Sequence, residues 1–405
     1  MRWTTKSRLG IPTTAVLLMA SVACGAPTAE APAPTYSSVA DKPSQPVELN
    51  VLDVAGNLQL TQGMIDEFVQ SHQDVVSKVS YTKATAPDMP GKLKAEQAAR
   101  QSQTHLVLTG TDGLAAVIDQ QLAVKVLPDY ANKFPNLMEN YLDSAAAMQE
   151  LAQGQGITVT YYPAGPLLEY DPSKVTSPPK TTDELLAWAK ANPKKFQYAV
   201  PANSGPGRTF LMGLPYLLGD KDPKDPENGW EKTWKFLAEL GEEIDYYPSG
   251  TTETMKNLAN GTSTMIASTT GWDINPRAIG TVPAEMKIGT LKGFHWVTDA
   301  HYAVVPKGIS ADVLSADLAL VKWMLDPKQQ AKAYDKGYFY PGPAIKDVTL
   351  DMAPQESKDV IKQFGRAEYD DLIKNTPKET SLPAAAQVKA FQRWDREIGS
   401  GKTRK

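Results

Sequence analysis

Apolar and polar positions in the first third of the chain alternate between the spacing of a strand and that of a helix. Segment 47–54 places apolar residues at nearly every second position, whereas 60–69 places them three and four residues apart. The elements predicted in this way are strand 47–54, helix 60–69, strand 75–82, helix 92–103, strand 106–108, helix 114–121 and strand 122–126. Strands that alternate with helices are typical of an α/β fold with a largely parallel sheet.

The same two periods continue through residue 325. Thr182 precedes Asp183 and Glu184, which predicts a helix start with Thr182 as the cap and carboxylates near the positive helix end. The further predicted elements are strands 157–162, 196–201, 263–268 and 303–306, and helices 208–218, 230–240, 252–259 and 311–325. Pro163, Gly165 and Pro166 are expected to interrupt the first of these strands.

The N-terminus has the order of an export signal. A short basic stretch is followed by apolar residues 11–23, too few for a permanent membrane span, and then by Cys24, the only cysteine of the chain. The ending Ser-Val-Ala-Cys resembles a lipobox, which implies a signal peptide over 1–23 and a lipidated Cys24; ordinary secretion with a chance cysteine is the alternative. Residues 24–46, rich in Pro, Ala and Ser, are predicted to form a disordered tether.

Composition excludes several classes of protein and of site. A net charge of −4 over 405 residues argues against a nucleic-acid partner, and one cysteine rules out an internal disulfide. No other apolar run approaches the length of a membrane span. The four histidines lack metal-ligand spacing, and no catalytic motif is present. We therefore expect no metal, no cofactor and no enzymatic activity.

Several stretches of the body carry a family resemblance. They are Asp53-Val-Ala-Gly56, Gly110-Thr-Asp112, Tyr170-Asp-Pro with Pro178-Pro-Lys-Thr-Thr-Asp-Glu-Leu-Leu186, Met255 to Gly261 with Met265-Ile and Gly271-Trp272, and Tyr338 to Ala344. In order and spacing the chain is similar to the extracellular solute-binding proteins of ABC importers, over about residues 47–345.

The resemblance implies a fold of the periplasmic-binding-protein type II. It consists of two α/β lobes with mixed, mostly parallel sheets, joined by crossing segments near 157–163, 297–303 and 338–343. Lobe one would hold 47–160 plus 302–340, and lobe two 161–301 plus 341–405. Hinges of a few residues would let the lobes close around a ligand.

Ligands of open α/β sheets bind where strands end and loops enter helices. That rule selects loops 55–57, 110–112, 161–162, 203–209 and 271–275. Trp272 is the strongest candidate, because an indole offers a flat face to a sugar ring or an amine. Asp273 and Asn275 would hydrogen-bond ligand hydroxyls or an ammonium, although an Asp in such a loop is as often a helix cap.

Two further groups complete the candidate site. Ser204 and Arg208 belong to a glycine-rich helix start, which supplies backbone N–H groups and a guanidinium for an anion; a tight turn with a surface Arg is the alternative. The other candidates are Asn57, Thr111, Asp112, Tyr161, Tyr162 and Tyr302. The resemblance implies that Asp112 accepts hydrogen bonds from ligand hydroxyls, whereas a cap and core packing would also explain Asp112 and the tyrosines.

The resemblance implies a monomeric, membrane-tethered receptor that captures a small polar solute and delivers it to an ABC permease. A carbohydrate is the first choice of solute, with a polyamine on Trp272 and Asp273 or an anionic phosphate ester or phosphonate on Arg208 as alternatives. An exported polysaccharide-acting enzyme using Asp112 and Asp273, and an adhesin, are the remaining hypotheses.

Overall fold

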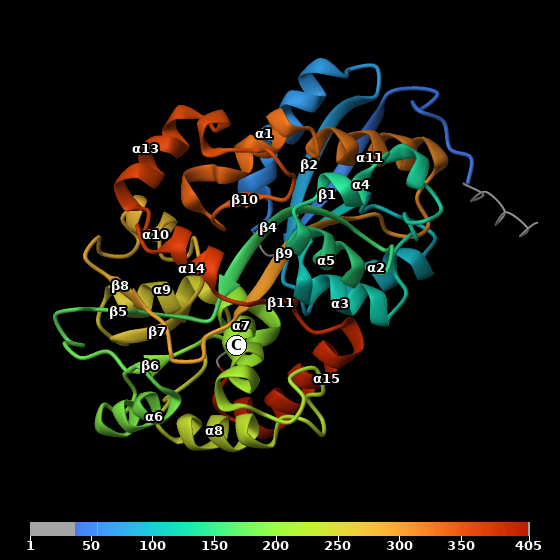
Figure 1. Ribbon diagram of the computed structural model, residues 1–405. Coiled ribbons are helices and arrows are strands. Elements are labelled where there is room, and N and C mark those ends of the chain that lie inside the picture. Colours follow the sequence, from blue (N-terminus) through green and yellow to red (C-terminus); the bar gives the residue numbers. More distant parts are fainter. Residues whose placement is uncertain (1–36, 55, 404–405) are drawn as a thin grey trace, which may run out of the picture. The chain divides into compact units, whose positions relative to one another are not determined.

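The computed structural model describes residues 37–54 and 56–403, and its strands form two separate sheets with helices packed around them (Figure 1). The α-helices before residue 200 are α1 (Leu58–Ser71), α2 (Met89–Ala98), α3 (Thr111–Asp119), α4 (Leu137–Asn140), α5 (Asp143–Leu151) and α6 (Thr182–Ala191). Those after it are α7 (Gly205–Leu218), α8 (Glu231–Glu242), α9 (Thr251–Ala259), α10 (Asn275–Ala278), α11 (Ala311–Met324), α12 (Pro327–Gln330), α13 (Gln355–Phe364), α14 (Tyr369–Asn375) and α15 (Ala384–Trp394). Short helical turns are η1 (Ala131–Lys133), η2 (Pro201–Asn203), η3 (Ala331–Gly337), η4 (Leu350–Met352) and η5 (Asp395–Gly399).

The larger sheet has the strand order β10-β4-β9-β3-β1-β2, with β11 paired on β9. Its strands are β1 (Val47–Val54), β2 (Val76–Ala84), β3 (Leu106–Gly110), β4 (Ile157–Gly165), β9 (Trp296–Val304), β10 (Gly342–Pro343) and β11 (Lys378–Glu379). The first three strands run parallel, because α1 and α2 return the chain to the same end of the sheet each time. β3, β4 and β9 are buried along their whole length, so helices cover both faces of the sheet there.

The smaller sheet has the order β6-β7-β5-β8, with strands β5 (Leu167–Tyr170), β6 (Phe196–Gln197), β7 (Met265–Ser268) and β8 (Lys287–Gly289). Its core gathers large aromatic side chains, among them Phe210 on α7 and Trp230 and Trp234 at the start of α8. α7 packs on β7 of this sheet and also on β4 and β9 of the larger one. The start of α7 therefore lies where the two sheets approach each other.

The expected mixed α/β architecture with two sheets is confirmed, with fewer parallel pairings than predicted. Among the described strands, four pairings are parallel and five are antiparallel. The antiparallel pairings are those of β9 with β3 and β4, of β4 with β10, and of β5 with β7 and β8.

Three predicted strands differ clearly from the structure. The strand expected over 196–201 is only the two residues of β6, and Pro201 already begins η2. Residues 122–126 form no strand; Ala123 alone makes a bridge to Pro306, and the apolar pattern arises because this irregular segment packs into the core of the larger sheet. The strand expected over 303–306 is the end of β9, which begins at Trp296. Since all nine residues of β9 are buried, no polar–apolar alternation marks its first half.

The segments expected to cross between lobes lie in the structure as follows. β4 continues through Tyr161 to Gly165, and the chain enters β5 only after Pro166. At the next crossing, residues 297–301 already belong to the larger sheet. β10 places residues 342–343, which the resemblance assigns to lobe two, on the edge of that same sheet.

The predicted N-cap of α6 is off by one residue. Thr181, with extended backbone, accepts a hydrogen bond from the Glu184 backbone N–H (3.1 Å), whereas Thr182 is already helical. We expect Thr181→Ala to lower the free energy of unfolding by about 1 kcal/mol, because the capping oxygen is lost. Thr182→Ala, which leaves the cap intact, is the matched control in urea unfolding. Equal losses in the two variants would contradict this cap assignment.

Part of the predicted tether lies against the body. The Lys133 ammonium donates to the Val39 carbonyl (2.9 Å), and Ser44 donates to the Asp312 carboxylate through both its backbone N–H (2.9 Å) and its hydroxyl (2.6 Å). Residues 37–46 of the predicted tether thus include residues that contact the body. Polar contacts made by individual residues leave no apolar periodicity, so this docking has no signal in the sequence pattern.

The predicted export signal over 1–23, Cys24 and tether residues 25–36 lie outside the described residues. Within residues 37–54 and 56–403, no helix is both long and apolar enough to cross a membrane.

The segment 326–403, for which the sequence pattern predicts no elements, joins both sheets. β11 pairs with the first residues of β9. α15 contacts α3 beside the larger sheet, and its Trp394 belongs to the core of the smaller sheet. α13 and α14 are short, and each buries only one or two side chains, which explains why their pattern is weak.

Candidate functional site: a polar cavity at four helix starts

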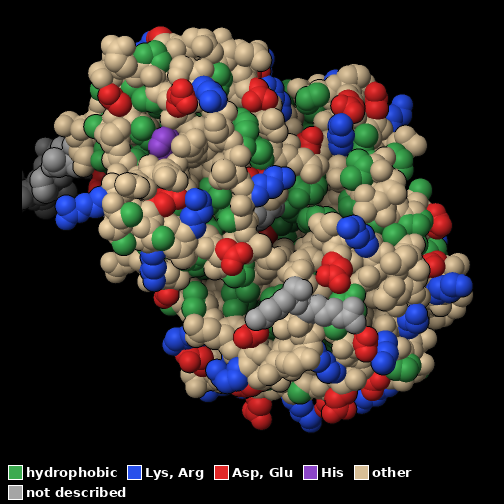
Figure 2. All heavy atoms as spheres, turned by 180° about the vertical axis from the view of Figure 1, so that it is seen from behind, with side chains coloured by type: hydrophobic (Ala, Val, Ile, Leu, Met, Phe, Trp, Pro, Cys, Tyr) green, Lys and Arg blue, Asp and Glu red, His purple; other side chains and the backbone are tan. Residues whose placement is uncertain are grey.

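One cavity, of about 240 Å³, is lined by residues from strands of the larger sheet and from helices α7 and α9, which pack on the smaller sheet. Its lining residues lie inside strands β4 and β9, at helix starts or in loops: Gly56, Asp112, Tyr162, Asn203, Ser204, Gly205, Arg208, Gly250, Thr251, Thr252, Trp272, Asp299, His301, Tyr338 and Phe339. The face shown in Figure 2 is hollowed near its middle, and acidic and basic side chains are scattered over it without gathering by sign.

The guanidinium of Arg208 lies between two carboxylates of the cavity wall. Its Nη2 donates to Asp299 Oδ2 (2.5 Å), and its Nη1 lies 2.9 Å from Asp112 Oδ2. Arg208 is on α7, Asp112 is on α3 and Asp299 is on β9, so the ion pairs connect elements packed on the two sheets. Arg208 is only 2% exposed, so water screens its attraction to the two carboxylates much less than it would at the surface.

Asp299 is fixed by several donors besides Arg208. The Tyr162 hydroxyl donates to its Oδ2 (2.7 Å), and the Thr111 hydroxyl (2.5 Å) and the Ala300 backbone N–H (3.0 Å) donate to its Oδ1. Burial alone would raise the pKa of Asp299, but the Arg208 charge and these hydrogen bonds outweigh it and hold the pKa below its ordinary value. Asp299 is therefore the permanent counter-ion of Arg208.

The ion pair of Asp112 with Arg208 is weaker than that of Asp299. Burial raises its pKa and the nearby Asp299 carboxylate adds to that rise, while Arg208 opposes it. Burial likewise lowers the pKa of His301 to about 4, so this ring is neutral at pH 7. Arg208 Nη1 lies 2.9 Å from Asp112 Oδ2, and Arg208 Nε has no hydrogen-bond partner among the described residues.

Four helices begin at the cavity, namely α1, α3, α7 and α9. The Ser204 hydroxyl accepts from the Gly207 backbone N–H (3.1 Å) and lies 2.7 Å from the Thr251 hydroxyl, which ties the starts of α7 and α9 together. The first backbone N–H groups of a helix lack helical partners, and the helix dipole adds positive potential at the same end. The cavity wall is therefore more positive than its side-chain charges indicate.

Aromatic side chains form the other wall. Phe339 packs between Tyr162 (4.7 Å between ring centroids) and His301 (4.5 Å). Trp272 meets Tyr338 nearly edge-on at 5.5 Å and remains partly exposed. Gly271, with φ +91°, permits this approach, because a Cβ there would lie 2.4 Å from the Phe339 backbone nitrogen.

The structure brings five of the eleven predicted ligand residues to the cavity lining: Asp112, Tyr162, Ser204, Arg208 and Trp272. Thr111 lies behind the lining and holds Asp299. Asn57 is fully buried at the start of α1, next to the lining residue Gly56. Tyr161 points to the opposite face of β4 from Tyr162 and packs in the core, since alternate residues of a strand face opposite sides.

Three predicted ligand residues have structural partners instead. Tyr302 is fully buried and its hydroxyl donates to the Met148 carbonyl (3.0 Å). Asp273 is fully buried against Arg366 and Tyr369, and Asn275 donates its side-chain amide to the Lys336 carbonyl. Asp273 and Asn275 thus stabilise the loop that presents Trp272 and do not line the cavity.

Several lining residues escaped the sequence reasoning. Asp299 and His301 lie in the unrecognised half of β9, where a lone Asp inside an apolar run was the available signal. Gly250, Thr251 and Thr252 begin a predicted helix and follow no recognised strand. Tyr338 and Phe339 belong to a segment matched only by resemblance, and their approach to Trp272 depends on contacts distant in sequence.

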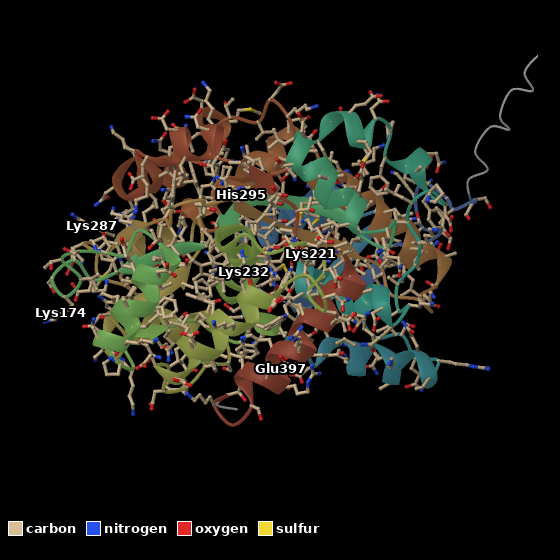
Figure 3. All side chains as sticks on the ribbon, turned by 60° about the horizontal axis from the view of Figure 1, so that its bottom comes forward. Lys174, Lys221, Lys232, Lys287, His295 and Glu397 are labelled. Atoms are coloured by element: carbon tan, nitrogen blue, oxygen red, sulfur yellow. The ribbon has the colours of Figure 1, made fainter. Side chains whose placement is uncertain are left out.

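No group of three or more His, Cys, Asp or Glu side chains is placed to hold a metal ion in the part of the chain that the structure describes. His295 (labelled in Figure 3) lies 3.2 Å from Glu379 and stacks on Tyr216. It is not among the residues that line the cavity containing His301.

Comparison with known proteins identifies a family whose model matches this chain. A family model described as bacterial extracellular solute-binding protein matches residues 63–362. No curated protein sequence matches the chain.

Solved structures share the fold at low identity. The periplasmic binding protein AfuA from Actinobacillus pleuropneumoniae, with fructose-6-phosphate bound, is 14% identical over 87% of this chain and 99% of its own, with a TM-score of 0.62. The ferric binding protein from Campylobacter jejuni is 16% identical over 86% of this chain and 98% of its own (TM-score 0.59). The spermidine/putrescine substrate-binding protein PotD from Streptococcus pneumoniae is 14% identical over 87% and 99% (TM-score 0.54).

Proposed function

Because this chain belongs to the bacterial extracellular solute-binding protein family, we propose that its cavity captures a small polar solute for an ABC importer. The observation that carries this proposal is the cavity itself, which is lined by residues from strands of the larger sheet and from helices packed on the smaller one. Solute contacts to both walls would favour a closed arrangement of the two lobes by their differential affinity for it. The permease would recognise that closed arrangement.

We propose a carbohydrate as the core of the solute. Trp272 is partly exposed on the cavity wall, where an indole face suits a sugar ring. Asn203, Thr252 and Asp112 line the same cavity and would hydrogen-bond ring hydroxyls. The AfuA structure, which contains fructose-6-phosphate, has the same fold and is consistent with this choice.

The alternatives receive less support from the geometry. A polyamine needs free carboxylates, whereas Asp112 and Asp299 are already paired with Arg208. A polysaccharide-acting enzyme would need two carboxylates facing each other across the cavity. The pair nominated for that role is not available, because Asp273 is buried behind the Trp272 loop and does not line the cavity.

The location of the protein is a separate point, which the sequence alone predicts. Export by the segment 1–23, lipid attachment at Cys24 and a monomeric receptor beside its permease remain predictions from the sequence. Labelling of cells with a radioactive fatty acid, compared between the natural chain and Cys24→Ser, would decide whether Cys24 is lipidated.

We expect Trp272→Ala to weaken solute binding by about thirtyfold, because a buried aromatic contact of this kind contributes about 2 kcal/mol. Protein stripped of bound solute by unfolding and refolding would be titrated calorimetrically with monosaccharides, hexose phosphates and spermidine. Trp188→Ala, at another partly buried tryptophan on α6, is the matched control and should leave binding unchanged. No heat with any of these solutes, in a correctly refolded protein, would contradict the proposed solute class.

A further inference from the structure

We propose that the carboxylate of Asp112 makes the cavity selective for uncharged sugars over acidic ones. This inference rests on the proposed carbohydrate and names the charge that the sugar must have. The charged lining residues are Asp112, Arg208 and Asp299, whose formal charges sum to −1. His301 adds no charge at pH 7, because burial lowers its pKa to about 4.

The single cation of the cavity is already paired with carboxylates of the protein. Arg208 Nη2 donates to Asp299 Oδ2 (2.5 Å), and Nη1 lies 2.9 Å from Asp112 Oδ2. An acidic sugar would reach this guanidinium only by displacing one of the carboxylates, which would then be buried without its counter-ion. Arg208 therefore gives the cavity no net attraction for an anion.

The two carboxylates differ in how many acceptor positions they have left. A carboxylate offers about four positions for hydrogen-bond donors. Asp299 uses all of them, for Arg208 and for the two hydroxyls and the backbone N–H that fix it. Asp112 accepts from the Gly113 backbone N–H (2.9 Å) and faces Arg208, and its other positions have no donor among the described residues. Asp112 is thus the carboxylate that remains open to solute hydroxyls.

The helix starts at the cavity reduce this negative charge without reversing it. Three of them have an acceptor for an early backbone N–H group: Asp53 in α1 (3.0 Å), Asp112 in α3 (2.9 Å) and Ser204 in α7 (3.1 Å). α9 begins without a side-chain acceptor. The partial charge of about +0.5 at its start is smaller than the full charge of one carboxylate.

Charge and hydrogen bonding at Asp112 favour the same kind of solute. A neutral sugar can donate its hydroxyls to the open positions of this carboxylate. An acidic sugar brings a second negative charge into a cavity of about 240 Å³, where no group of a bound monosaccharide lies far from Asp112. Like charges repel each other more strongly there than in water, because the surroundings screen them less.

Pairs of sugars that differ in one charged group measure this selectivity. Protein stripped of bound solute would be titrated calorimetrically with glucose, galactose and mannose, with their uronates and with spermidine. A pH of 8 favours ionised Asp112, whose pKa burial raises. We expect the uronate of a bound sugar to have a dissociation constant at least about tenfold higher than that of the neutral sugar.

The Asp112→Asn variant should bring that ratio to within about threefold, because it removes the charge and keeps the side-chain shape. A merely structural loss would weaken both sugars of a pair alike and leave the ratio unchanged. Asp112→Glu keeps the charge and should keep the natural ratio. Asp119→Asn, at the exposed end of the same helix, is the matched control for net charge and should also keep it.

The outcomes separate this inference from the proposed carbohydrate. Equal or tighter binding of the uronates by the natural chain would overturn the charge selectivity and support a carbohydrate. A ratio that stays high in Asp112→Asn would overturn the assignment to Asp112. Binding of spermidine and of no sugar would overturn both proposals, and so would failure of every probe. A high ratio in the natural chain that Asp112→Asn abolishes and Asp119→Asn preserves would support both.

Discussion

Asp273→Asn is expected to lower the free energy of unfolding by about 3–5 kcal/mol, because it leaves buried guanidinium groups without their counter-ion. Asp273 is fully buried, and its Oδ2 accepts from Arg366 Nε (2.8 Å) while its Oδ1 accepts from the Tyr369 hydroxyl (2.6 Å). Arg277 Nη2 lies 3.7 Å from the same Oδ2. One carboxylate thus joins the Trp272 loop to α10 and to the segment that begins α14.

Urea unfolding at pH 7 measures this loss, with Asp183→Asn on the exposed start of α6 as the control. The control should change the free energy of unfolding by at most about 1 kcal/mol, the value of a carboxylate near a helix start. Losses of similar size in the two variants would show that the buried network does not stabilise the loop. We also expect Asp273→Asn to weaken solute binding, since Trp272 is its neighbour in the chain.

Glu169→Gln is expected to stabilise the protein increasingly as the pH rises from about 5 to 8. Glu169 is fully buried on β5, and burial together with the Asp273 charge raises its pKa to about 8. In the unfolded chain a Glu titrates near about 4.3. Between these values the folded protein holds a proton that the unfolded chain has lost. Stability therefore falls with pH by about 1.4 kcal/mol per unit in the natural chain.

Glutamine imitates the protonated carboxyl and does not titrate, so the variant lacks this fall. Its amide can still meet the Ser268 hydroxyl, which lies 2.9 Å from Glu169 Oε2. Urea midpoints at pH 5, 6.5 and 8 would separate progressively, and above about pH 8 the difference would stay constant. Glu184→Gln on exposed α6 should run parallel to the natural chain. A Glu169→Gln curve that also runs parallel would contradict a buried, protonated Glu169.

The fold could be inferred from the sequence largely because strand and helix periods alternate through its first half. Helix α1 is amphipathic, with one buried face and one exposed face, and this spacing predicts a helix. Strand β1 begins with an alternation of polar and apolar residues, which predicts a strand. β9 carries no such signal, since burial of both faces removes the alternation. The segment 122–126 shows the reverse error, an apolar pattern produced by packing without a strand.

The candidate site was predictable only where one loop supplies both the position and the chemistry. Ser204 and Arg208 follow from the glycine-rich start of one helix. Asp273 looked like a ligand residue for the same local reason, because its partners Arg366 and Tyr369 lie more than 90 residues away. Asp299 was not predicted, because its importance comes from Arg208, Tyr162 and Thr111, which meet it in space.

The partial exposure of Trp272 gives the molecule an optical property. Trp230, Trp234, Trp296 and Trp394 are at most 5% exposed, so their surroundings stay apolar whatever enters the cavity. Trp272 alone, of the tryptophans in residues 37–54 and 56–403, lines the cavity, where it meets Tyr338 edge-on. Its indole emission would shift when a solute replaces water at its face, which makes the natural chain a fluorescent sensor of its own cargo.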